Sequence, residues 1–375
     1  MAFTKLSILI PVYNERYYVE QLIDQVIASP LPSDMERELV IVDDCSTDGT
    51  REILDRIANE RPDVVKLHAH AKNQGKGAAI RTAVERATGD LCVIQDADLE
   101  YDPRDYDRLL RPLLSGDADV VYGSRFLSSD YRQVHAYWHA FGNRVLTTAS
   151  NLFTDLTLTD METCYKVAKS SILKSIPLRS NRFGMEPELT AKFAKRGCRI
   201  YEVPISYRGR TYDEGKKIKW IDGFKAVWAI LYFRLVDDIY KDEYGPAAHG
   251  LSRTHRTHAW IADVIKPWVG ESVLEVGAGL GITTLKLLPR RSYTVGDDDS
   301  LNLDYLSSRF GNYTWLEVHK IDLAEPDDFA GLEACFDTVV CLSALEHVDR
   351  DRESLQSLSS TLSPGGAAII MVPQG

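Results

Sequence analysis

The fold is decided by ten residues that begin at position 91 and read Leu91-Cys92-Val93-Ile94-Gln95-Asp96-Ala97-Asp98-Leu99-Glu100. The first half is a short apolar run, which predicts a buried strand. The second half places two carboxylates, Asp96 and Asp98, one residue apart after that strand, so both point the same way. Like charges at this spacing repel unless a cation lies between them, and Mg²⁺ or Mn²⁺ prefers oxygen ligands. The stretch therefore predicts a divalent metal and a diphosphate-bearing substrate at the strand end.

Strands and helices alternate on both sides of this stretch. β-branched runs predict four further strands, at 6–11, 39–42, 64–67 and 120–122. Apolar residues at helical spacing predict helices at 16–28, 50–59, 75–87 and 103–114. This alternation predicts an α/β fold with a mostly parallel sheet covered on both faces. Ligands of such sheets bind at the carboxyl ends of the strands, so the candidate site residues are those that follow each strand.

Composition narrows the class of protein. Of the 375 residues, 44% are hydrophobic and 26% charged, which predicts a soluble globular protein of two domains, one of them cut short. The formal net charge of -11 excludes a general nucleic-acid binder, which needs a basic face. No apolar run reaches about 18 residues, so no transmembrane helix is predicted. The six cysteines form no CxxC pair, which indicates a reducing cytosol rather than a disulfide or zinc framework.

An acidic turn follows the strand predicted at 39–42, and it reads Asp43-Asp44-Cys45-Ser46-Thr47-Asp48-Gly49. Asp48 is predicted to cap the next helix. Asp43 and Asp44 cannot both be caps, which leaves one of them to accept hydrogen bonds from a ligand such as a nucleobase.

Two cationic groups are predicted at the same edge. Asn73-Gln74-Gly75-Lys76-Gly77 opens a helix. Its glycines either permit close packing or, with Lys76, form an anion site at the helix N-terminus. Arg125 follows the strand at 120–122, where a guanidinium suits a phosphate, although a surface arginine is often only solvated.

These strand ends together resemble the nucleotide-sugar-binding half of family 2 glycosyltransferases with the GT-A fold. More narrowly, they resemble the polyprenyl-phosphate sugar transferases of the dolichol-phosphate mannose synthase group. The motifs that carry the resemblance lie at 10–15, 42–50, 73–79, 96–100 and 123–126, within a matching region of about residues 5–240. The resemblance implies inverting, metal-dependent transfer of a hexose from a nucleotide sugar, of the GDP-mannose or UDP-glucose type, to a polyprenyl or dolichyl phosphate.

The resemblance also assigns residues to roles. The pocket for the base and ribose is implied to consist of Pro11, Tyr13, Glu15, Val42 and Asp44. The diphosphate and its Mg²⁺ or Mn²⁺ are implied to lie at Asp96, Ala97 and Asp98, with Glu100 as a further metal-side residue. The phosphate charge is implied to be met by Lys76, Arg125, Arg210 and Lys216, the last two of which alternatively belong to a solvated basic loop.

The acceptor side is represented by Asp160, within Thr159-Asp160-Met161-Glu162-Thr163-Cys164-Tyr165-Lys166. In relatives that attack with a sugar hydroxyl, the matching aspartate is the general base. A phosphate acceptor is already an oxyanion and needs little base help, so here Asp160 orients groups or caps the next turn. Glu186 and Glu188 are interpreted as first-turn residues of a helix rather than catalytic ones.

An amphipathic helix is predicted at about 218–240, flanked by Lys216, Lys217, Lys219, Lys225 and Arg234. It packs on its own domain or lies on a membrane surface. With a lipid-linked acceptor, we expect a peripheral protein at the cytoplasmic face of the membrane. A polar linker is predicted at 241–255, so the domains are expected at 1–240 and 256–375.

The second domain opens on a strand and glycine loop, Val273-Leu274-Glu275-Val276-Gly277-Ala278-Gly279-Leu280-Gly281. Strands are predicted at 272–276, 293–296, 315–320, 338–341 and 367–372. This order resembles class I S-adenosylmethionine-dependent methyltransferases with a Rossmann-like fold, and a nicotinamide dehydrogenase is the competing interpretation. The resemblance implies that S-adenosylmethionine is lined by Glu275, Gly277, Gly279 and Gly281, with Asp297 or Asp298 at the ribose and Asp322 beside the adenine.

The chain stops after the fifth predicted strand of this domain, where the family continues with two more strands. A longer two-enzyme chain has been cut short, or the domain no longer catalyses. In either case we expect weak cofactor binding and no methyl transfer from these 375 residues. Alternatives to the leading function are transfer to a glycan hydroxyl, a bifunctional glycosyltransferase and methyltransferase in the full-length chain, a methyltransferase whose first domain only binds nucleotide sugar, and a silent binding module.

Overall fold

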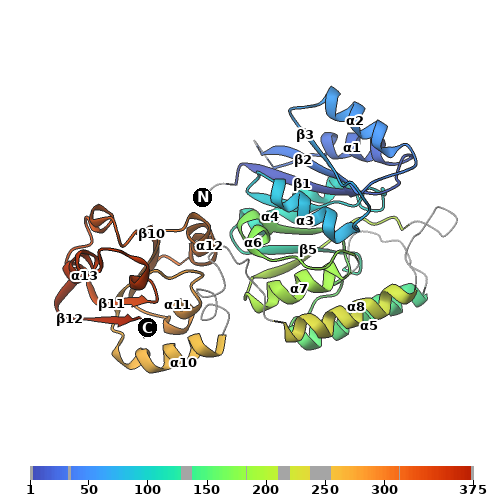
Figure 1. Cartoon of the computed structure of the whole chain (residues 1–375). Helices are drawn as coiled ribbons and strands as arrows, with labels where there is room; N and C mark the ends of the chain where they lie inside the picture. The colour runs from blue at the N-terminus through green and yellow to red at the C-terminus, as the bar shows by residue number, and fades with distance from the viewer. Residues whose placement is uncertain are drawn as a thin grey trace. The chain divides into compact units, whose positions relative to one another are not determined.

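The computed structural model describes residues 3–32, 35–127, 137–182, 184–209, 220–236, 255–311 and 313–372. The chain divides into two compact units, Met1–Lys241 and Asp242–Gly375. In each unit helices surround one β-sheet (Figure 1). The predicted α/β class is therefore confirmed for both.

The first unit contains seven strands in its described residues: β1 (Lys5–Val12), β2 (Glu36–Asp43), β3 (Val65–Ala69), β4 (Leu91–Ile94), β5 (Val120–Ser124), β6 (Lys166–Lys169) and β7 (Ile200–Pro204). The helices are α1 (Val19–Ala28), α2 (Thr50–Glu60), α3 (Lys76–Arg86), α4 (Tyr106–Leu114), α5 (Tyr137–Thr154), α6 (Ser170–Ser175), α7 (Met185–Lys195) and α8 (Trp220–Leu235). A 3-10 turn, η1 (Pro103–Asp105), precedes α4, because Pro103 fits the first turn and Asp102 accepts the N–H of Arg104.

The strand order of this sheet is β3-β2-β1-β4-β6-β5-β7. Only β6 runs antiparallel to its neighbours, so β5 has the same direction as β4 although the two do not pair. The carboxyl ends of β1 and β2 lie in register, with Val12 opposite Asp43. The loops after β1, β2, β4 and β5 therefore meet at one edge, as predicted.

Backbone strain is concentrated at this edge. Asn14, Cys45 and Leu99 have φ angles of 54°, 64° and 62°, and they follow β1, β2 and β4. Left-handed backbone is uncommon outside glycine and costs free energy, so it persists where surrounding contacts impose it. Nothing in the residue types announced this feature.

The second unit contains β8 (Ser272–Val276), β9 (Ser292–Asp297), β10 (Leu316–Lys320), β11 (Phe336–Leu342) and β12 (Leu362–Met371). Its helical segments are α10 (His255–Ile265), η2 (Lys266–Trp268), α11 (Ile282–Leu287), α12 (Ser300–Phe310), η3 (Pro326–Phe329), η4 (Leu345–His347) and α13 (Asp351–Ser360). The strand order is β10-β9-β8-β11-β12, and all pairs are parallel. β12 begins at Leu362, earlier than the predicted Ala367, because Leu362 already pairs with Phe336 of β11. The register shifts before Ala367 pairs with Thr338, and Gly365 in between has a φ angle of 86°.

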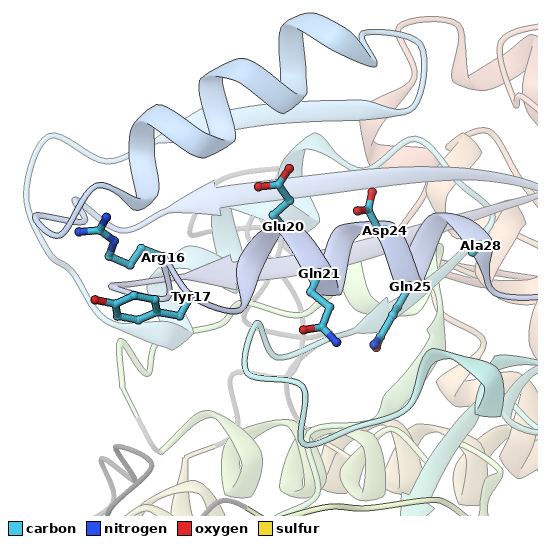
Figure 2. A pocket seen from close by; sticks show the side chains of 7 residues that line it. All are labelled: Arg16, Tyr17, Glu20, Gln21, Asp24, Gln25 and Ala28. Carbon is cyan, nitrogen blue, oxygen red and sulfur yellow. The ribbon is translucent and has the colours of Figure 1, made fainter.

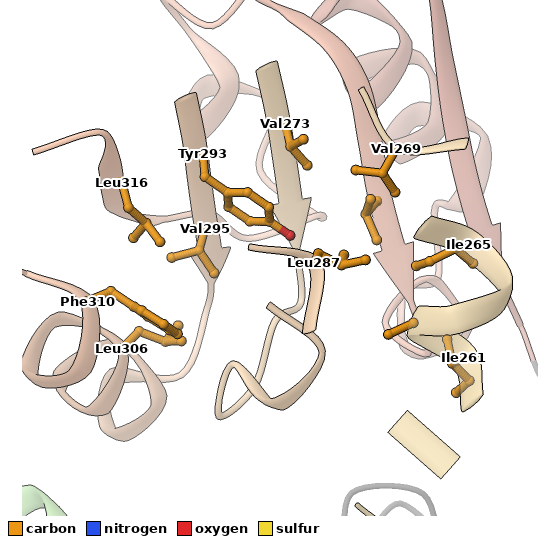
Figure 3. Close-up of a cluster of buried hydrophobic side chains, with 12 residues drawn as sticks. Ile261, Ile265, Val269, Val273, Leu287, Tyr293, Val295, Leu306, Phe310 and Leu316 are labelled. Atoms are coloured by element: carbon orange, nitrogen blue, oxygen red, sulfur yellow. The ribbon is translucent and has the colours of Figure 1, made fainter. Parts of the chain in front are cut away.

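The core of the second unit lies on both faces of its sheet. Val273 lies in a cluster with residues of α10 and α12 (Figure 3), and Val340 belongs to the same cluster. Leu274 and Val339, their neighbours in sequence, belong to the opposite cluster. This alternation follows from the two-residue period of a strand.

Candidate functional site

The loops after β1 and β2 of the first unit are joined by short polar contacts. The N–H of Asn14 donates to Ser46 Oγ at 3.0 Å, and the N–H of Thr47 donates to Asn14 Oδ1 at 2.8 Å. The N–H of Glu15 donates to Thr50 Oγ1 at 3.0 Å. Tyr13, which precedes Asn14, is exposed at this edge, where a nucleobase could stack on its ring.

Two residues of the predicted base pocket have other roles. Val42 is wholly buried in the core, so its side chain does not face a ligand. Asp44 is also buried, and its carboxylate accepts the N–H groups of Gln74 and Gly75 at 2.8 and 2.7 Å and contacts His70 Nδ1 at 2.7 Å. Asp43 accepts the N–H of Ser46 at 3.2 Å. Both carboxylates therefore hold the protein's own loops, and the further role of one of them in binding a ligand stays a prediction.

The predicted anion site at the start of α3 is also wrong. The N–H groups of Gly77 and Ala78 donate to the carbonyl of Asn181, at 3.0 and 3.3 Å. A Cβ on Gly77 would lie 2.1 Å from the carbonyl oxygen of Ser180. The glycines therefore serve close packing of α3 against the segment around residue 180, which was the alternative interpretation.

Lys76 instead forms an ion pair. Its Nζ lies 2.8 Å from Asp96 Oδ1 and 3.3 Å from Glu186 Oε1. Burial lowers the pKa of Lys76, but the carboxylate of Asp96 and that of Glu186 outweigh it and hold the pKa well above its ordinary value. Glu186 and Glu188 lie in the first turn of α7, as predicted.

The three predicted metal ligands are not gathered into one cluster. Asp98 Oδ1 accepts the N–H of Glu100 at 3.1 Å, whereas Glu100 Oε2 accepts the hydroxyl of Tyr207 at 2.6 Å. Among the residues described, no three His, Cys, Asp or Glu side chains could hold a metal ion together. Asp96 and Asp98 supply the oxygen donors that Mg²⁺ or Mn²⁺ prefers, but a complete shell needs substrate phosphates and water. The donor type fits the metal, and Glu100 does not join it in this geometry.

Arg125 and Asp160 form the second charged pair at the edge. Arg125 Nε and Nη2 donate to the two carboxylate oxygens of Asp160 at 2.6 and 2.7 Å, which is a bidentate contact. The Arg125 guanidinium also lies over the ring of Tyr207, 5.1 Å from its centroid. Burial raises the pKa of Asp160, but Arg125 more than offsets this and lowers the pKa overall. Asp160 is therefore a weak base that holds Arg125 in place.

Sequence reasoning missed the polar support beneath these residues. Gln95 is fully buried, and its Oε1 accepts the hydroxyls of Tyr106 and Tyr165, each at 2.7 Å. The Asn143 side chain on α5 donates to Asp160 Oδ1 at 3.2 Å. A buried glutamine at the end of an apolar run was the one available signal for this network.

Two predicted phosphate ligands, Arg210 and Lys216, lie outside the described residues. A shallow hollow of about 580 Å³ runs along α1 (Figure 2), but it is lined only by residues of that helix and the turn before it. None of the predicted site residues lines that hollow.

The second unit places its predicted cofactor residues unevenly. Glu275 is buried, and one carboxylate oxygen accepts the hydroxyls of Thr284 and Tyr293 at 2.7 Å. Its role in lining the cofactor stays a prediction. Asp297 accepts the N–H of Gly279 at 2.7 Å, which joins the glycine loop to the end of β9. Asp322 accepts the N–H of Ala324 at 2.8 Å.

The glycines of that loop are needed for different reasons. A Cβ on Gly277 would lie 2.4 Å from the Cβ of Ala344, and one on Gly281 would lie 2.7 Å from the ring of Phe310. Gly279 faces open space. Asp298, which follows Asp297, is exposed. Room for a cofactor therefore exists at Gly279, beside the carboxylate of Asp297.

Two family models match the chain. Residues 7–176 match the model "Glycosyl transferase family 2", and residues 274–368 match the model "Methyltransferase domain". The first unit therefore contains a region that matches family 2 glycosyltransferases, and the second unit contains a region that matches methyltransferase domains.

Curated relatives of the glycosyltransferase domain are undecaprenyl-phosphate 4-deoxy-4-formamido-L-arabinose transferases. The Pseudomonas aeruginosa protein is 28% identical over 211 residues, which are 56% of this chain and 60% of that one. The Proteus mirabilis protein is 27% identical over 212 residues, which are 56% of this chain and 62% of that one. The match thus spans about three fifths of these relatives.

Solved structures similar to the chain include glucosyl-3-phosphoglycerate synthase from Mycobacterium tuberculosis. The complex with Mn²⁺, uridine diphosphate and phosphoglyceric acid is 20% identical, with a TM-score of 0.48, over 64% of this chain and 80% of that one. The complex with Mg²⁺ and uridine diphosphate is 21% identical, also with a TM-score of 0.48.

Proposed function

We propose that the first unit transfers a hexose from a nucleotide sugar to a polyprenyl phosphate, with inversion and with the help of Mg²⁺ or Mn²⁺. One structural observation carries this proposal: Asp96 and Asp98 meet Lys76 and the Arg125–Asp160 pair at one edge of the sheet. The undecaprenyl-phosphate named for the curated relatives supports a lipid phosphate acceptor.

Different residues of the chain have different roles in the proposed transfer. Asp96 and Asp98 would hold a divalent cation, which would neutralise the charge of the nucleoside diphosphate leaving group. Arg125 donates hydrogen bonds to phosphate oxygens, and Asp160 keeps its guanidinium oriented. Lys76 adds a second positive charge at the diphosphate end. The acceptor attacks the anomeric carbon from the face opposite the leaving group, and this single displacement inverts the centre.

The electrostatics of Asp160 favour a phosphate acceptor over a hydroxyl. A hydroxyl nucleophile needs a base with a pKa near the working pH. Asp160 has a lowered pKa and is paired with Arg125. An oxyanion acceptor does not require such a base, so transfer to a glycan hydroxyl remains the second candidate.

The helix pair α5 and α8 supports peripheral contact with a membrane. The two helices pack side by side (Figure 1). Their outer faces expose Phe141, Val145 and Leu152 on α5, and Trp228, Leu231 and Leu235 on α8, close in sequence to Arg144, Lys225 and Arg234. None of the helices in the described part of the chain is long and apolar enough to span a membrane. We place the protein at the cytoplasmic face, where the charged donor is available.

For the second unit we propose S-adenosylmethionine as the ligand, held by the loop at Gly279 and by Asp297. The exposed Asp298 stands as an alternative to Asp297 at the ribose. Methyl transfer by a full-length bifunctional chain is the second candidate function.

The Asp98→Ala variant tests the metal role. Removing the carboxylate leaves the diphosphate charge unneutralised, so we expect transfer to a short polyprenyl phosphate to fall by at least about 100-fold. The product is measured by mass for UDP- and GDP-sugars with Mn²⁺. An Asp107→Ala variant on exposed α4 is the control. Wild-type rates from Asp98→Ala in EDTA exclude the metal role.

A further inference from the structure

We propose that Glu162 and Glu186 form a subsite that binds the hydroxyl groups of the transferred sugar. The inference rests on the proposed function and adds a determinant of donor specificity to it. Glu186 lies in the first turn of α7, and Glu162 lies two residues after Asp160.

The position of the pair follows from its neighbours. Glu186 Oε1 lies 3.3 Å from Lys76 Nζ, which itself lies 2.8 Å from Asp96 Oδ1. Asp160, just before Glu162, holds Arg125. The pair therefore lies between the cationic groups proposed to meet the diphosphate. Since a single glycosidic oxygen joins the hexose to the diphosphate, the hexose must lie within a few ångströms of Asp96.

Each of the two side chains has one carboxylate oxygen that accepts no hydrogen bond from the described residues. Glu162 Oε1 and Glu186 Oε2 are buried, and neither has a hydrogen-bond partner among the described residues. Glu186 is only 4% exposed. A buried carboxylate oxygen without a donor costs free energy, so a native structure rarely retains one without a reason.

Glu188, a second glutamate on α7, provides a comparison, because its carboxylate is bound within the protein. Glu188 accepts the N–H of Arg179 at 2.8 Å, the N–H of Ser180 at 2.7 Å and the ammonium of Lys192 at 2.7 Å. Both of its oxygens are satisfied within the protein. The difference between Glu188 and its neighbour Glu186 indicates that the unsatisfied oxygens await a ligand.

The chemistry of the pair selects hydroxyl groups. Phosphate oxygens repel a carboxylate, whereas a sugar hydroxyl donates one hydrogen bond and accepts others. Burial and the nearby Glu186 carboxylate raise the pKa of Glu162, so a shared proton adds a donor to the pair. A ring of hydroxyls matches this mixture of donors and acceptors.

Calorimetric titration of the full chain with Mn²⁺ tests the subsite. The ligands are UDP-glucose and GDP-mannose, each compared with UDP and GDP, which lack the sugar. For Glu162→Gln and Glu186→Gln we expect about tenfold weaker binding of the nucleotide sugar but unchanged binding of the nucleoside diphosphate. We also expect Glu162→Gln to melt at the same or a higher temperature, because it removes the repulsion between two neighbouring carboxyl groups. Glu188→Gln should melt lower and keep its preference for the sugar nucleotide.

The outcomes separate the two proposals. If the unchanged chain binds none of these four ligands, both the proposed function and the subsite fail. If it binds nucleotide sugars and both glutamine variants keep full affinity for them, only the subsite fails. Equal losses for nucleotide sugar and nucleoside diphosphate also overturn the subsite, because they indicate a general structural role.

Discussion

At the residue scale, burial of single carboxyl groups gives the molecule a pH dependence. Glu275 is 3% exposed and accepts two hydroxyls, and burial raises its pKa to about 7. Unfolding returns this pKa to about 4.3. Between about pH 4.3 and about pH 7, the folded state therefore keeps a proton on Glu275 that the unfolded state has lost. The contribution of Glu275 to the free energy of unfolding is therefore fully present below about pH 4.3. It is lost as the pH rises through about 7, and the loss amounts to up to about 4 kcal/mol.

The Glu275→Gln variant should remove this dependence, because an amide oxygen can still accept from Tyr293 without carrying charge. We expect the melting temperature of the second unit to fall between about pH 5 and about pH 8 in the natural chain and to stay level in the variant. Scanning calorimetry checks this. A parallel decline in both proteins would contradict the assignment to Glu275.

Single residues also show where prediction from the sequence ends. The acidic pair at 96 and 98 and the arginine at 125 could be placed at one edge, because strand ends carry ligands in parallel sheets. The contacts of Asp44 could not be placed, since its partners are backbone N–H groups about 30 residues away. The sequence does not distinguish an aspartate that accepts hydrogen bonds from a loop from an aspartate that binds a ligand.

At the element scale, α3 is held against the segment around Ser180 at van der Waals distance. We expect Gly77→Ala to destabilise the first unit by about 2 kcal/mol or more, because its Cβ would lie 2.1 Å from a backbone carbonyl oxygen. Gly142→Ala on α5 is the matched control, since nothing lies within 4 Å of its Cβ, and it should stabilise by about 1 kcal/mol. Urea unfolding measures both; equal effects would disprove the close approach.

The exposed face of α5 and α8 predicts binding to anionic vesicles. Trp228 is 69% exposed on α8, and we expect Trp228→Ser to weaken co-sedimentation several-fold, because an interfacial indole is lost. Trp260→Ser on α10 is the control, since that indole is 65% exposed but lies in the other unit. Equal binding of all three proteins, or no binding at all, would favour a soluble acceptor.

Elements differ in how well the sequence predicts them. The apolar strands β1, β2 and β4 were predicted within about two residues at their carboxyl ends, since their residues are both β-branched and buried. β6 was missed because Lys166-Val167-Ala168-Lys169 looks too polar for the middle of a sheet. Both lysines are buried there: Lys169 pairs with Asp119 at 2.9 Å, and Lys166 donates to the carbonyl of Met161.

At the scale of the whole molecule, two units with separate sheets predict separate responses to ligands. A nucleotide sugar with Mn²⁺ should raise the melting midpoint of the first unit, and S-adenosylmethionine should raise that of the second. At a ligand concentration of 100 times the dissociation constant, the free energy of unfolding rises by about 2.7 kcal/mol. Scanning fluorimetry with each ligand alone measures this. The Asp98→Ala and Asp297→Ala variants are reciprocal controls, and a ligand that shifts neither midpoint has no site in the chain.

The antiparallel strand β6 also governs when the site can exist during synthesis. β4 carries Asp96 and Asp98 at its end, β5 carries Arg125, and β6 is inserted between them. A ribosome has therefore made both halves of this edge well before it makes the strand that joins them. The nascent chain can form β1 to β4 early, with Lys76 beside Asp96, but Arg125 joins them only after residue 169 has emerged. A nascent chain stopped before that point should lack a working edge, however well its first strands have folded.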